Sequence, residues 1–438
     1  MKNIDTLIHA SWVIPVEPKG VVLNDHSIAI QDGHIVDILP TADASEKYQA
    51  EHLVERSGHL LVPGLINTHT HAAMSLMRGL ADDLPLMSWL NDHIWPTEAQ
   101  WVSPDFVRDG TRLAMAEMLR GGTTCFNDMY FFPDEVARQA EHAGMRAVVG
   151  LIVIDFPTAW AQDADEYINK GIALNDEIKH SPLVRAAFAP HGPYTVSDAP
   201  LQKVVMYAEE LDIPIHIHIH ETAEEISGSL EQHGKRPLAR LDELGLLGPR
   251  LLAVHMTQLE KDEIARIAET NSNVVHCPES NLKLASGFCP VQQLNDAGIN
   301  MTLGTDGAAS NNDLDMFGEM RTAALLAKGV AGDASALPAA DALAMATINS
   351  ARALGLDDIC GSLSVGKAAD IVAVKMDDLE TQPLYHAISQ LVYATGRDKV
   401  NDVWVAGRHL LKERQLTTLD EDAIIESASH WREKIAQN

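Results

Sequence analysis

Short apolar segments alternate with amphipathic segments through the middle of the chain. Eight of the apolar segments are rich in β-branched residues, which is typical of buried strands. They are "LLVPGLINTHTH", "TTCFNDM", "RAVVGLIVID", "VRAAFAPHGPY", "IPIHIHIHE", "LLAVHMT", "NVVHCPES" and "INMTLGTDGAAS". The segments between them, such as "SPDFVRDGTRLAMAEMLRGG", have the apolar spacing of helices. Because alternating strands and helices form parallel βα units, we predict an α/β fold with a (β/α)8 TIM-like barrel over residues 59–360.

The two ends of the chain have a different pattern. Residues 1–58 contain short strand-like segments separated by turns such as "QDGH". The same pattern returns in residues 361–438, in "DIVAV" and "VNDVWVAGRHLL". We therefore expect both termini to form one small β-sandwich domain, followed by a helix over roughly residues 419–436.

Composition and charge exclude several classes of protein. Of the 438 residues, 46% are hydrophobic and 22% charged, which is typical of a globular protein. The 33 basic and 62 acidic side chains give a formal charge of −29, which would repel the backbone of a nucleic acid polymer and an anionic membrane surface. We find no signal-peptide pattern and no apolar stretch near the ~18 residues of a membrane span. The four cysteines form no CxxC pair, so we expect a reducing, cytoplasmic location without disulfides.

Polar residues follow the predicted strands where each strand ends. They are His69, His71, Asp128, His191, the 216–221 cluster, His255, the 276–281 segment and Asp306. Barrel enzymes build their sites at the carboxyl ends of the strands, because all eight ends meet at one rim. The sequence therefore predicts a functional site there.

The spacing of these residues indicates a metal site. On a strand His69 and His71 face the same side, and Asp306 follows the last predicted strand. Together with a histidine from residues 216–221 they form the mixed nitrogen and oxygen ligand set of a catalytic divalent ion. An isolated His-x-His pair is also compatible with an exposed strand end. Strand alternation alone does not distinguish His216, His218 and His220.

Five motifs together resemble the amidohydrolase superfamily, and specifically its metal-dependent aminohydrolase branch. The motifs are "PGLINTHTH", "HIHE", "VH" after the sixth predicted strand, "GTDGAASN" and "GSLSVGKAADIV", and the resemblance covers nearly the whole chain. It implies four metal ligands: His69, His71, His218 and Asp306. His216 is then a deeper residue of the barrel, and His220 remains a rival ligand on physical grounds.

The fourth predicted strand bears on the number of metal ions. Branches of the superfamily with two metals carry a carbamylated lysine there, whereas this segment is "AAFAPHGPYTV". The resemblance therefore implies one ion per chain, with Zn²⁺ expected and Fe²⁺ or Mn²⁺ as alternatives. It also implies a homo-oligomer, a dimer or larger.

The resemblance implies a hydrolytic deaminase that acts on a purine nucleoside. Glu221 would move the proton, while His255 and Asp306 would orient the attacking water and stabilise the intermediate. Each residue also has an alternative role when considered singly. Glu221 could be an acidic residue in the first turn of a helix, and His255 could be a buried histidine that hydrogen-bonds the backbone. Glu221 and Asp306 are also expected to contact the substrate.

Further substrate contacts follow from two motifs. "IWPTEAQW" resembles the segment of the 5-methylthioadenosine/S-adenosylhomocysteine deaminase family that supplies a glutamate, here Glu98, to the ribose hydroxyls. In "APHGPYTVS", His191 matches the histidine of that family that contacts the purine. The connection over residues 155–167 has no Lys or Arg and offers Phe156, Pro157 and Trp160 instead. An apolar wall suits a methylthio group, so we expect 5′-methylthioadenosine as substrate ahead of S-adenosylhomocysteine and adenosine.

Three other functions remain compatible with the same residues. One is deamination or dechlorination of another N-heterocycle, such as guanine, cytosine or a triazine. The others are amide hydrolysis with two metals and a metal-holding barrel that binds a ligand without turnover. A further motif, "HCPESNLKLASG", contains His276, Cys277 and Glu279 and resembles a second metal site, but we expect a loop that shapes the pocket.

Overall fold

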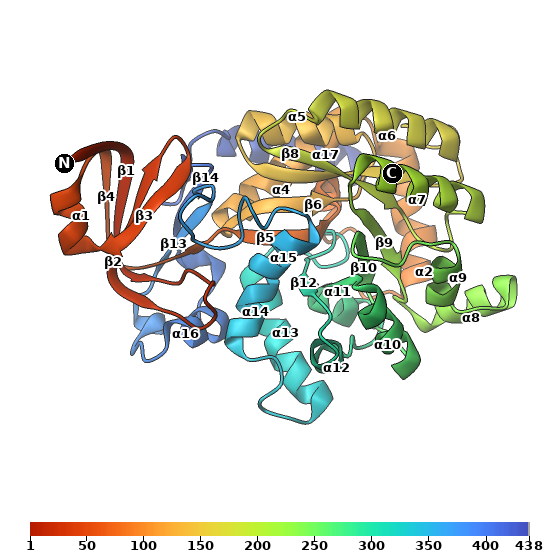
Figure 1. The fold of residues 1–438 in the computed structure, drawn as a ribbon. Helices are drawn as coiled ribbons and strands as arrows, with labels where there is room; N and C mark the ends of the chain where they lie inside the picture. The colour runs from red at the N-terminus through yellow and green to blue at the C-terminus, as the bar shows by residue number, and fades with distance from the viewer. Residues whose placement is uncertain (437–438) are drawn as a thin grey trace.

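The computed structural model describes residues 1–436 and contains two eight-stranded sheets (Figure 1). One sheet is the barrel, whose strands are parallel and follow one another in sequence order. Its strands are β5 (Leu65–Thr70), β6 (Thr123–Asp128), β7 (Arg146–Val153), β8 (Val184–Pro190), β9 (Ile215–Ile219), β10 (Leu251–His255), β11 (Asn273–His276) and β12 (Met301–Leu303). Each falls within one of the eight predicted segments.

Helices lie around the outside of the barrel between successive strands (Figure 1). The main ones are α4 (Pro104–Arg120), α5 (Pro133–Ala143), α6 (Ala164–Ile178), α7 (Asp198–Leu211), α8 (Ala223–His233) and α10 (Lys261–Thr270). One more, α13 (Met316–Ala331), follows the last barrel strand. Side-chain hydrogen bonds to backbone amides fix where two of these helices begin. Asp163 accepts a hydrogen bond from the Glu166 amide at 2.9 Å, and Thr222 accepts one from the Glu225 amide at 3.3 Å. These side chains cap α6 and α8, so the loops leave the rim in fixed directions.

The barrel closes between its first and last strands through side chains as well as backbone. The Thr68 hydroxyl donates to the Leu303 carbonyl at 2.7 Å, and the Asp306 amide donates to the His69 carbonyl at 3.0 Å. The start and the end of the barrel therefore meet beside the predicted metal ligands.

The second sheet unites the two ends of the chain. Its strands are β1 (Lys2–Val13), β2 (Leu23–Gln31), β3 (His34–Pro40), β4 (Tyr48–Pro63), β13 (Ile371–Lys375), β14 (Val400–Val405), β15 (Arg408–Lys412) and β16 (Gln415–Leu416). The sheet runs β16-β15-β14-β13-β4-β1-β2-β3, with β4 antiparallel to β13. Ile8, Ile30, Leu61, Ile371 and Trp404 share one buried core. The predicted fold class, a (β/α)8 barrel with a small β domain from both termini, is confirmed. The strands of the terminal domain, predicted as a β-sandwich, form one mixed eight-stranded sheet.

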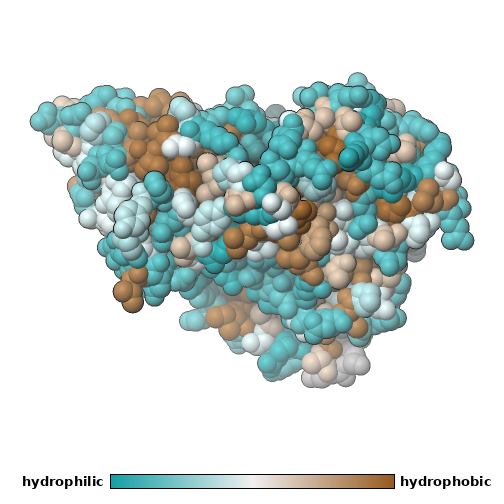
Figure 2. All heavy atoms as spheres, turned by 90° about the horizontal axis from the view of Figure 1, so that it is seen from below, coloured by the Kyte–Doolittle hydropathy of each residue, from teal (hydrophilic) through white to brown (hydrophobic). Residues whose placement is uncertain are grey.

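The terminal helix α17 (Glu421–Ala436) begins close to its predicted start and packs on the barrel. Its Trp431 contacts Phe106 of α4 at 5.2 Å between ring centroids, and the indole N–H donates to Asp109 at 2.9 Å. The surface seen in Figure 2 is largely hydrophilic with scattered apolar patches, as the acid-rich composition predicts. Within residues 1–436 no helix is both long and apolar enough to cross a membrane.

A buried ion pair joins the barrel to the terminal sheet. Arg146 begins β7, and its Nε and Nη2 donate to the Asp370 carboxylate at 2.9 and 3.2 Å. Asp370 lies just before β13 and also accepts the Ala406 amide at 2.7 Å. Each ionic side chain is only 3% exposed, so neither charge has water as an alternative partner.

We expect Asp370→Ala to destabilise the protein strongly, because it leaves the Arg146 guanidinium buried and unpaired. Breaking such a pair costs about 3–5 kcal/mol in the free energy of unfolding. Asp212→Ala is the matched control, since the Asp212–Arg250 pair is 85% and 42% exposed and is worth about 0–1 kcal/mol. Denaturant unfolding of the three proteins measures both effects, and equal losses in the two variants would contradict the role assigned to Asp370.

Candidate active site

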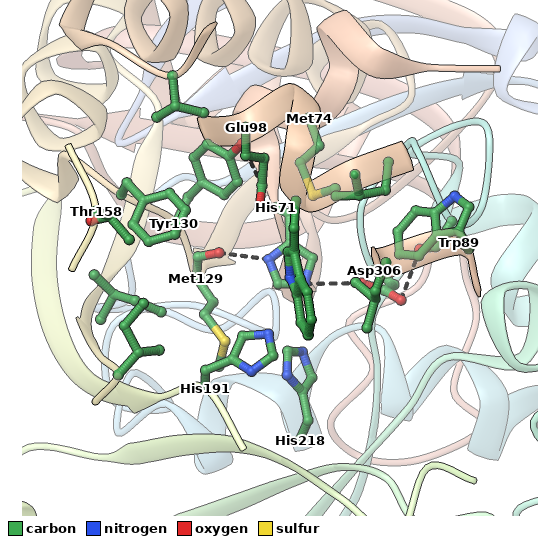
Figure 3. Close-up of a pocket in the computed structure, with 18 of the residues that line it drawn as sticks. His71, Met74, Trp89, Glu98, Met129, Tyr130, Thr158, His191, His218 and Asp306 are labelled. Carbon is green, nitrogen blue, oxygen red and sulfur yellow. Dashed lines mark hydrogen bonds and ion pairs between the residues drawn. The ribbon is translucent and has the colours of Figure 1, made fainter. Parts of the chain in front are cut away.

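A cavity of about 500 Å³ opens at the carboxyl ends of the barrel strands. Every predicted site residue lines it except His69, which is fully buried beneath it. His71, His191, His218 and Asp306 point toward the same space (Figure 3). The volume is within the roughly 300–1,000 Å³ of small-molecule sites.

The ligand atoms of the predicted metal ligands form two groups that share His69: those of His69, His71 and Asp306 lie within 4.8 Å of one another, and so do those of His69, His218 and His255. His69 Nε2 and His71 Nε2 each lie 3.2 Å from Asp306 Oδ1. His218 Nε2 lies 3.1 Å from His69 Nε2. Two ligands of a tetrahedral zinc with bonds of about 2.0–2.1 Å are themselves about 3.4 Å apart. The spacing and the nitrogen and oxygen donors therefore fit one divalent ion.

Hydrogen bonds aim the imidazoles of the first strand. His71 Nδ1 lies 2.6 Å from the Met129 carbonyl and donates to it, so Nε2 faces the cavity. His69 Nδ1 lies 2.8 Å from His216 Nε2. His216 thus contacts the predicted ligand His69 and does not line the cavity. Such partners fix the orientation of metal-binding histidines.

His220 lies outside the cluster. Its Nε2 accepts a hydrogen bond from the Leu238 amide at 3.0 Å, and its Nδ1 lies 3.2 Å from the Gln258 carbonyl. Its φ of +56° is left-handed, which ends the strand alternation that put His216, His218 and His220 on one face. The structure therefore places His218 rather than His220 beside His69.

Burial and charge control the protonation of these groups. Burial lowers the pKa of His69 to about 4 and holds that of His218 well below its usual range, so both rings are neutral, as metal ligands must be. Although burial raises the pKa of Asp306, hydrogen bonds from His69 and His71 hold it well below the usual value. Burial likewise lowers the pKa of His71, but Asp306 raises it to about 9. The attraction that retains a proton on His71 also favours a bound cation.

Glu221 and His255 face each other at the edge of the cluster. Glu221 Oε2 lies 3.8 Å from His255 Nε2, and burial raises the pKa of Glu221. The helix-starting carboxylate is Glu225 instead, which accepts the amides of His220 and Glu221 at 2.9 and 2.7 Å. Glu221 is thus left to face the cavity.

Tyr130, which the sequence analysis did not identify, hydrogen-bonds Glu98, the residue predicted to bind ribose. Glu98 lies on α3 (Trp95–Trp101), and its Oε1 accepts a hydrogen bond from the Tyr130 hydroxyl at 2.8 Å. Burial raises the pKa of Glu98 to about 7, despite that bond. Tyr130 comes two residues after β6 and so occupies a strand-end position, the one signal that could have identified it.

His191 lies at the end of β8 with its Nδ1 3.1 Å from the Thr195 hydroxyl. Burial lowers the pKa of His191 to about 3, so the ring is neutral. Asp128, another strand-end residue, accepts hydrogen bonds from the Thr70 hydroxyl at 2.9 Å and the Ala72 amide at 2.7 Å. It therefore shapes the turn after β5.

The predicted apolar wall is partly correct. Phe156 and Pro157 line the cavity. The prediction is wrong for Trp160, which packs on Phe132 at 5.3 Å between ring centroids and does not reach the cavity. Among the described residues that line the cavity there is no Lys or Arg.

The motif that resembled a second metal site forms a short helix, α11 (Pro278–Lys283). Glu279 accepts the Thr322 hydroxyl at 2.7 Å, and Cys277 is fully buried. Among residues 1–436, its His276, Cys277 and Glu279 belong to no group of three converging ligand atoms.

Comparison with known proteins identifies the family of the chain. A model of the amidohydrolase family matches residues 60–410. The chain belongs to that family. It is 53% identical over 433 residues to a 5-methylthioadenosine/S-adenosylhomocysteine deaminase of Teredinibacter turnerae, covering 99% of this chain and 98% of that protein. It is 44% identical over 402 residues to a 5′-deoxyadenosine deaminase of Methanothermobacter thermautotrophicus, covering 92% and 93%.

A solved structure is also similar. The adenosine deaminase from Xanthomonas campestris with bound zinc is 55% identical, with a TM-score of 0.99 over 100% of both chains. The resemblance to the 5-methylthioadenosine/S-adenosylhomocysteine deaminase family is thus confirmed over the full length.

We expect His218→Gln to lose the metal and His220→Gln to keep it, because only the His218 ring reaches the cluster. Both variants exchange one buried ring of β9 or its end for an amide, so each controls for the other. Elemental analysis after dialysis gives the zinc per chain, expected near one for His220→Gln and at least tenfold lower for His218→Gln. The reverse result would make His220 the ligand.

Proposed function

We propose that the protein is a metal-dependent hydrolytic deaminase of adenine nucleosides, converting 5′-methylthioadenosine to 5′-methylthioinosine and ammonia. The observation that carries the proposal is one cavity lined by three kinds of group. They are the predicted metal ligands His71, His218 and Asp306 with the acid Glu221, the carboxylate of Glu98, and apolar side chains such as Phe156 and Pro157. The full-length relatives named as adenine nucleoside deaminases support it.

We propose His69, His71, His218 and Asp306 as the ligands of one zinc ion, although Fe²⁺ or Mn²⁺ accept the same donors. Such an ion supplies a water molecule activated for attack on the amine-bearing ring carbon. Asp306 is held for this role by the hydroxyls of Ser280 and Ser310, which donate to its Oδ2 at 2.6 and 2.9 Å.

The protein's own groups then move protons. Glu221 accepts the proton of the attacking water and delivers it to a ring nitrogen, which the raised pKa of this buried carboxyl assists near neutral pH. His255 orients the water through Nε2, the nitrogen that faces Glu221. His191, neutral and facing the cavity, hydrogen-bonds the purine.

Glu98 would bind the ribose. Tyr130 fixes its carboxylate, and an ionised carboxylate accepts two hydrogen bonds from a vicinal diol. The 5′ substituent would lie against apolar side chains such as Phe156 and Pro157. S-adenosylhomocysteine ends in a carboxylate and an ammonium, and the described residues that line the cavity include no Lys or Arg to pair with the former. This favours 5′-methylthioadenosine.

We also propose a cytoplasmic location and a homo-oligomer of two or more chains. Four free, buried cysteines support the location, because secreted domains commonly pair theirs. A charge of −29 supports a small-molecule partner over nucleic acid. Light scattering of the purified protein measures the number of chains.

An ammonia-release assay tests the proposed function. We expect turnover of 5′-methylthioadenosine with kcat/KM at least tenfold above that of S-adenosylhomocysteine, because only the latter places an unpaired charge against apolar residues. Guanine and cytosine, which lack ribose, serve as controls. Ligand binding without ammonia release would favour a non-catalytic barrel, and comparable kcat/KM for the two nucleosides would refute the substrate order.

Glu98→Gln tests the ribose contact and its pH dependence. A lost charged hydrogen bond costs about 1.5–3 kcal/mol, so we expect KM for 5′-methylthioadenosine to rise about 10- to 100-fold. Because the pKa of Glu98 is about 7, the carboxylate protonates as the pH falls through 7, and kcat/KM should decline below that pH in the wild type. The variant should lack this decline. A variant with unchanged KM and an unchanged pH profile would contradict the role.

A further inference from the structure

The short helix α11 enters the function proposed so far only through Ser280, yet two of its side chains contact residues of the active site. The Ser280 hydroxyl donates to Asp306 Oδ2 at 2.6 Å. Asn281 Oδ1 lies 2.8 Å from His255 Nδ1. Asn281 and His255 are each only 1% exposed. One turn of helix thus contacts both a proposed metal ligand and the proposed orienting histidine.

The helix is fixed from outside the site. The Glu279 carboxylate accepts the Thr322 hydroxyl of α13 at 2.7 Å. Lys283 Nζ forms an ion pair with Asp82 at 2.6 Å. A helix anchored at both ends can hold the side chain of Asn281 in one place.

The orientation of the His255 ring depends on the position of the Asn281 side chain. His255 ends β10 with a left-handed φ of +76°, so the strand itself does not set the direction of the ring. Its Nε2 faces Glu221 Oε2 at 3.8 Å, and its Nδ1 faces Asn281. An amide oxygen accepts, so the Nδ1 proton is donated to Asn281. Nε2 is then the nitrogen left for the reacting water.

We propose that Asn281 is a positioning residue that fixes the tautomer and orientation of His255 for the deamination. The inference rests on the proposed function. It assigns to Asn281 the part that a carboxylate plays behind other catalytic histidines, where loss of the correct tautomer costs much of kcat but leaves substrate binding intact.

Two substitutions of Asn281 separate this role from packing. Asn281→Asp keeps an acceptor of the same shape and adds a negative charge; its second oxygen replaces Nδ2, a buried atom without a hydrogen-bond partner within residues 1–436. Asn281→Leu has a similar size and no acceptor. Leu282→Ala, on the same helix at a side chain 43% exposed, is the control.

We expect Asn281→Leu to lower kcat for 5′-methylthioadenosine about 100-fold while KM and zinc content stay within about threefold of wild type. Asn281→Asp should retain kcat within about tenfold, and Leu282→Ala should match the wild type. Loss of activity in Asn281→Asp equal to that in Asn281→Leu would overturn the assigned tautomer. A kcat within threefold of wild type in Asn281→Leu would overturn the positioning role.

A crystal structure of the Asn281→Leu variant gives a readout that needs no activity. We expect the His255 ring to turn away from Glu221, whereas an unmoved ring overturns the inference. If Asn281→Leu fails to fold, the smaller Asn281→Ala takes its place with the same expected outcomes. An inactive wild type with a displaced ring in the variant would refute the proposed function and leave the positioning intact.

Discussion

The active site depends on the junction between the first and last barrel strands. There the Asp306 amide donates to the His69 carbonyl, and the Asp306 side chain lies 3.2 Å from both His69 Nε2 and His71 Nε2. A carboxylate buried at this point is stable only beside positive charge or strong donors. The chain supplies two imidazoles and two hydroxyls, and the same environment suits a cation. Closure of the barrel and assembly of the proposed metal site therefore depend on the same contacts.

The residues around this junction differ in how burial shifts their pKa values. Burial keeps His69, His191 and His218 neutral, whereas it raises the pKa of Glu98 and Glu221. Two of the proposed metal ligands, His69 and His218, thus carry no proton, whereas the buried acids Glu98 and Glu221 have pKa values shifted toward neutral pH. The apolar wall contributes by excluding the water that would otherwise weaken each of these interactions.

Periodicity and strand-end chemistry predicted the barrel, its eight strands and the residues at its rim. These follow from local spacing, which the sequence contains directly. The positions that were missed depend on distances across the barrel. Tyr130 resembles an ordinary packing residue until α3 brings Glu98 beside it. His220 could be separated from His218 only by a left-handed backbone angle. Trp160 was misplaced because the loop after β7 turns its indole toward Phe132.

The pairing of β4 with β13 has a consequence for how the protein folds. Two seams, β5 beside β12 and β4 beside β13, each join residues near the start of the chain to residues near its end. During synthesis, the edge of β4 that pairs with β13 stays unpaired until the ribosome has released the last quarter of the chain. Contacts between residues so far apart in sequence form slowly, because the chain loses the entropy of closing a long loop before strand pairing stabilises it. The newly made chain therefore passes through a stage in which exposed strand edges invite association with other chains.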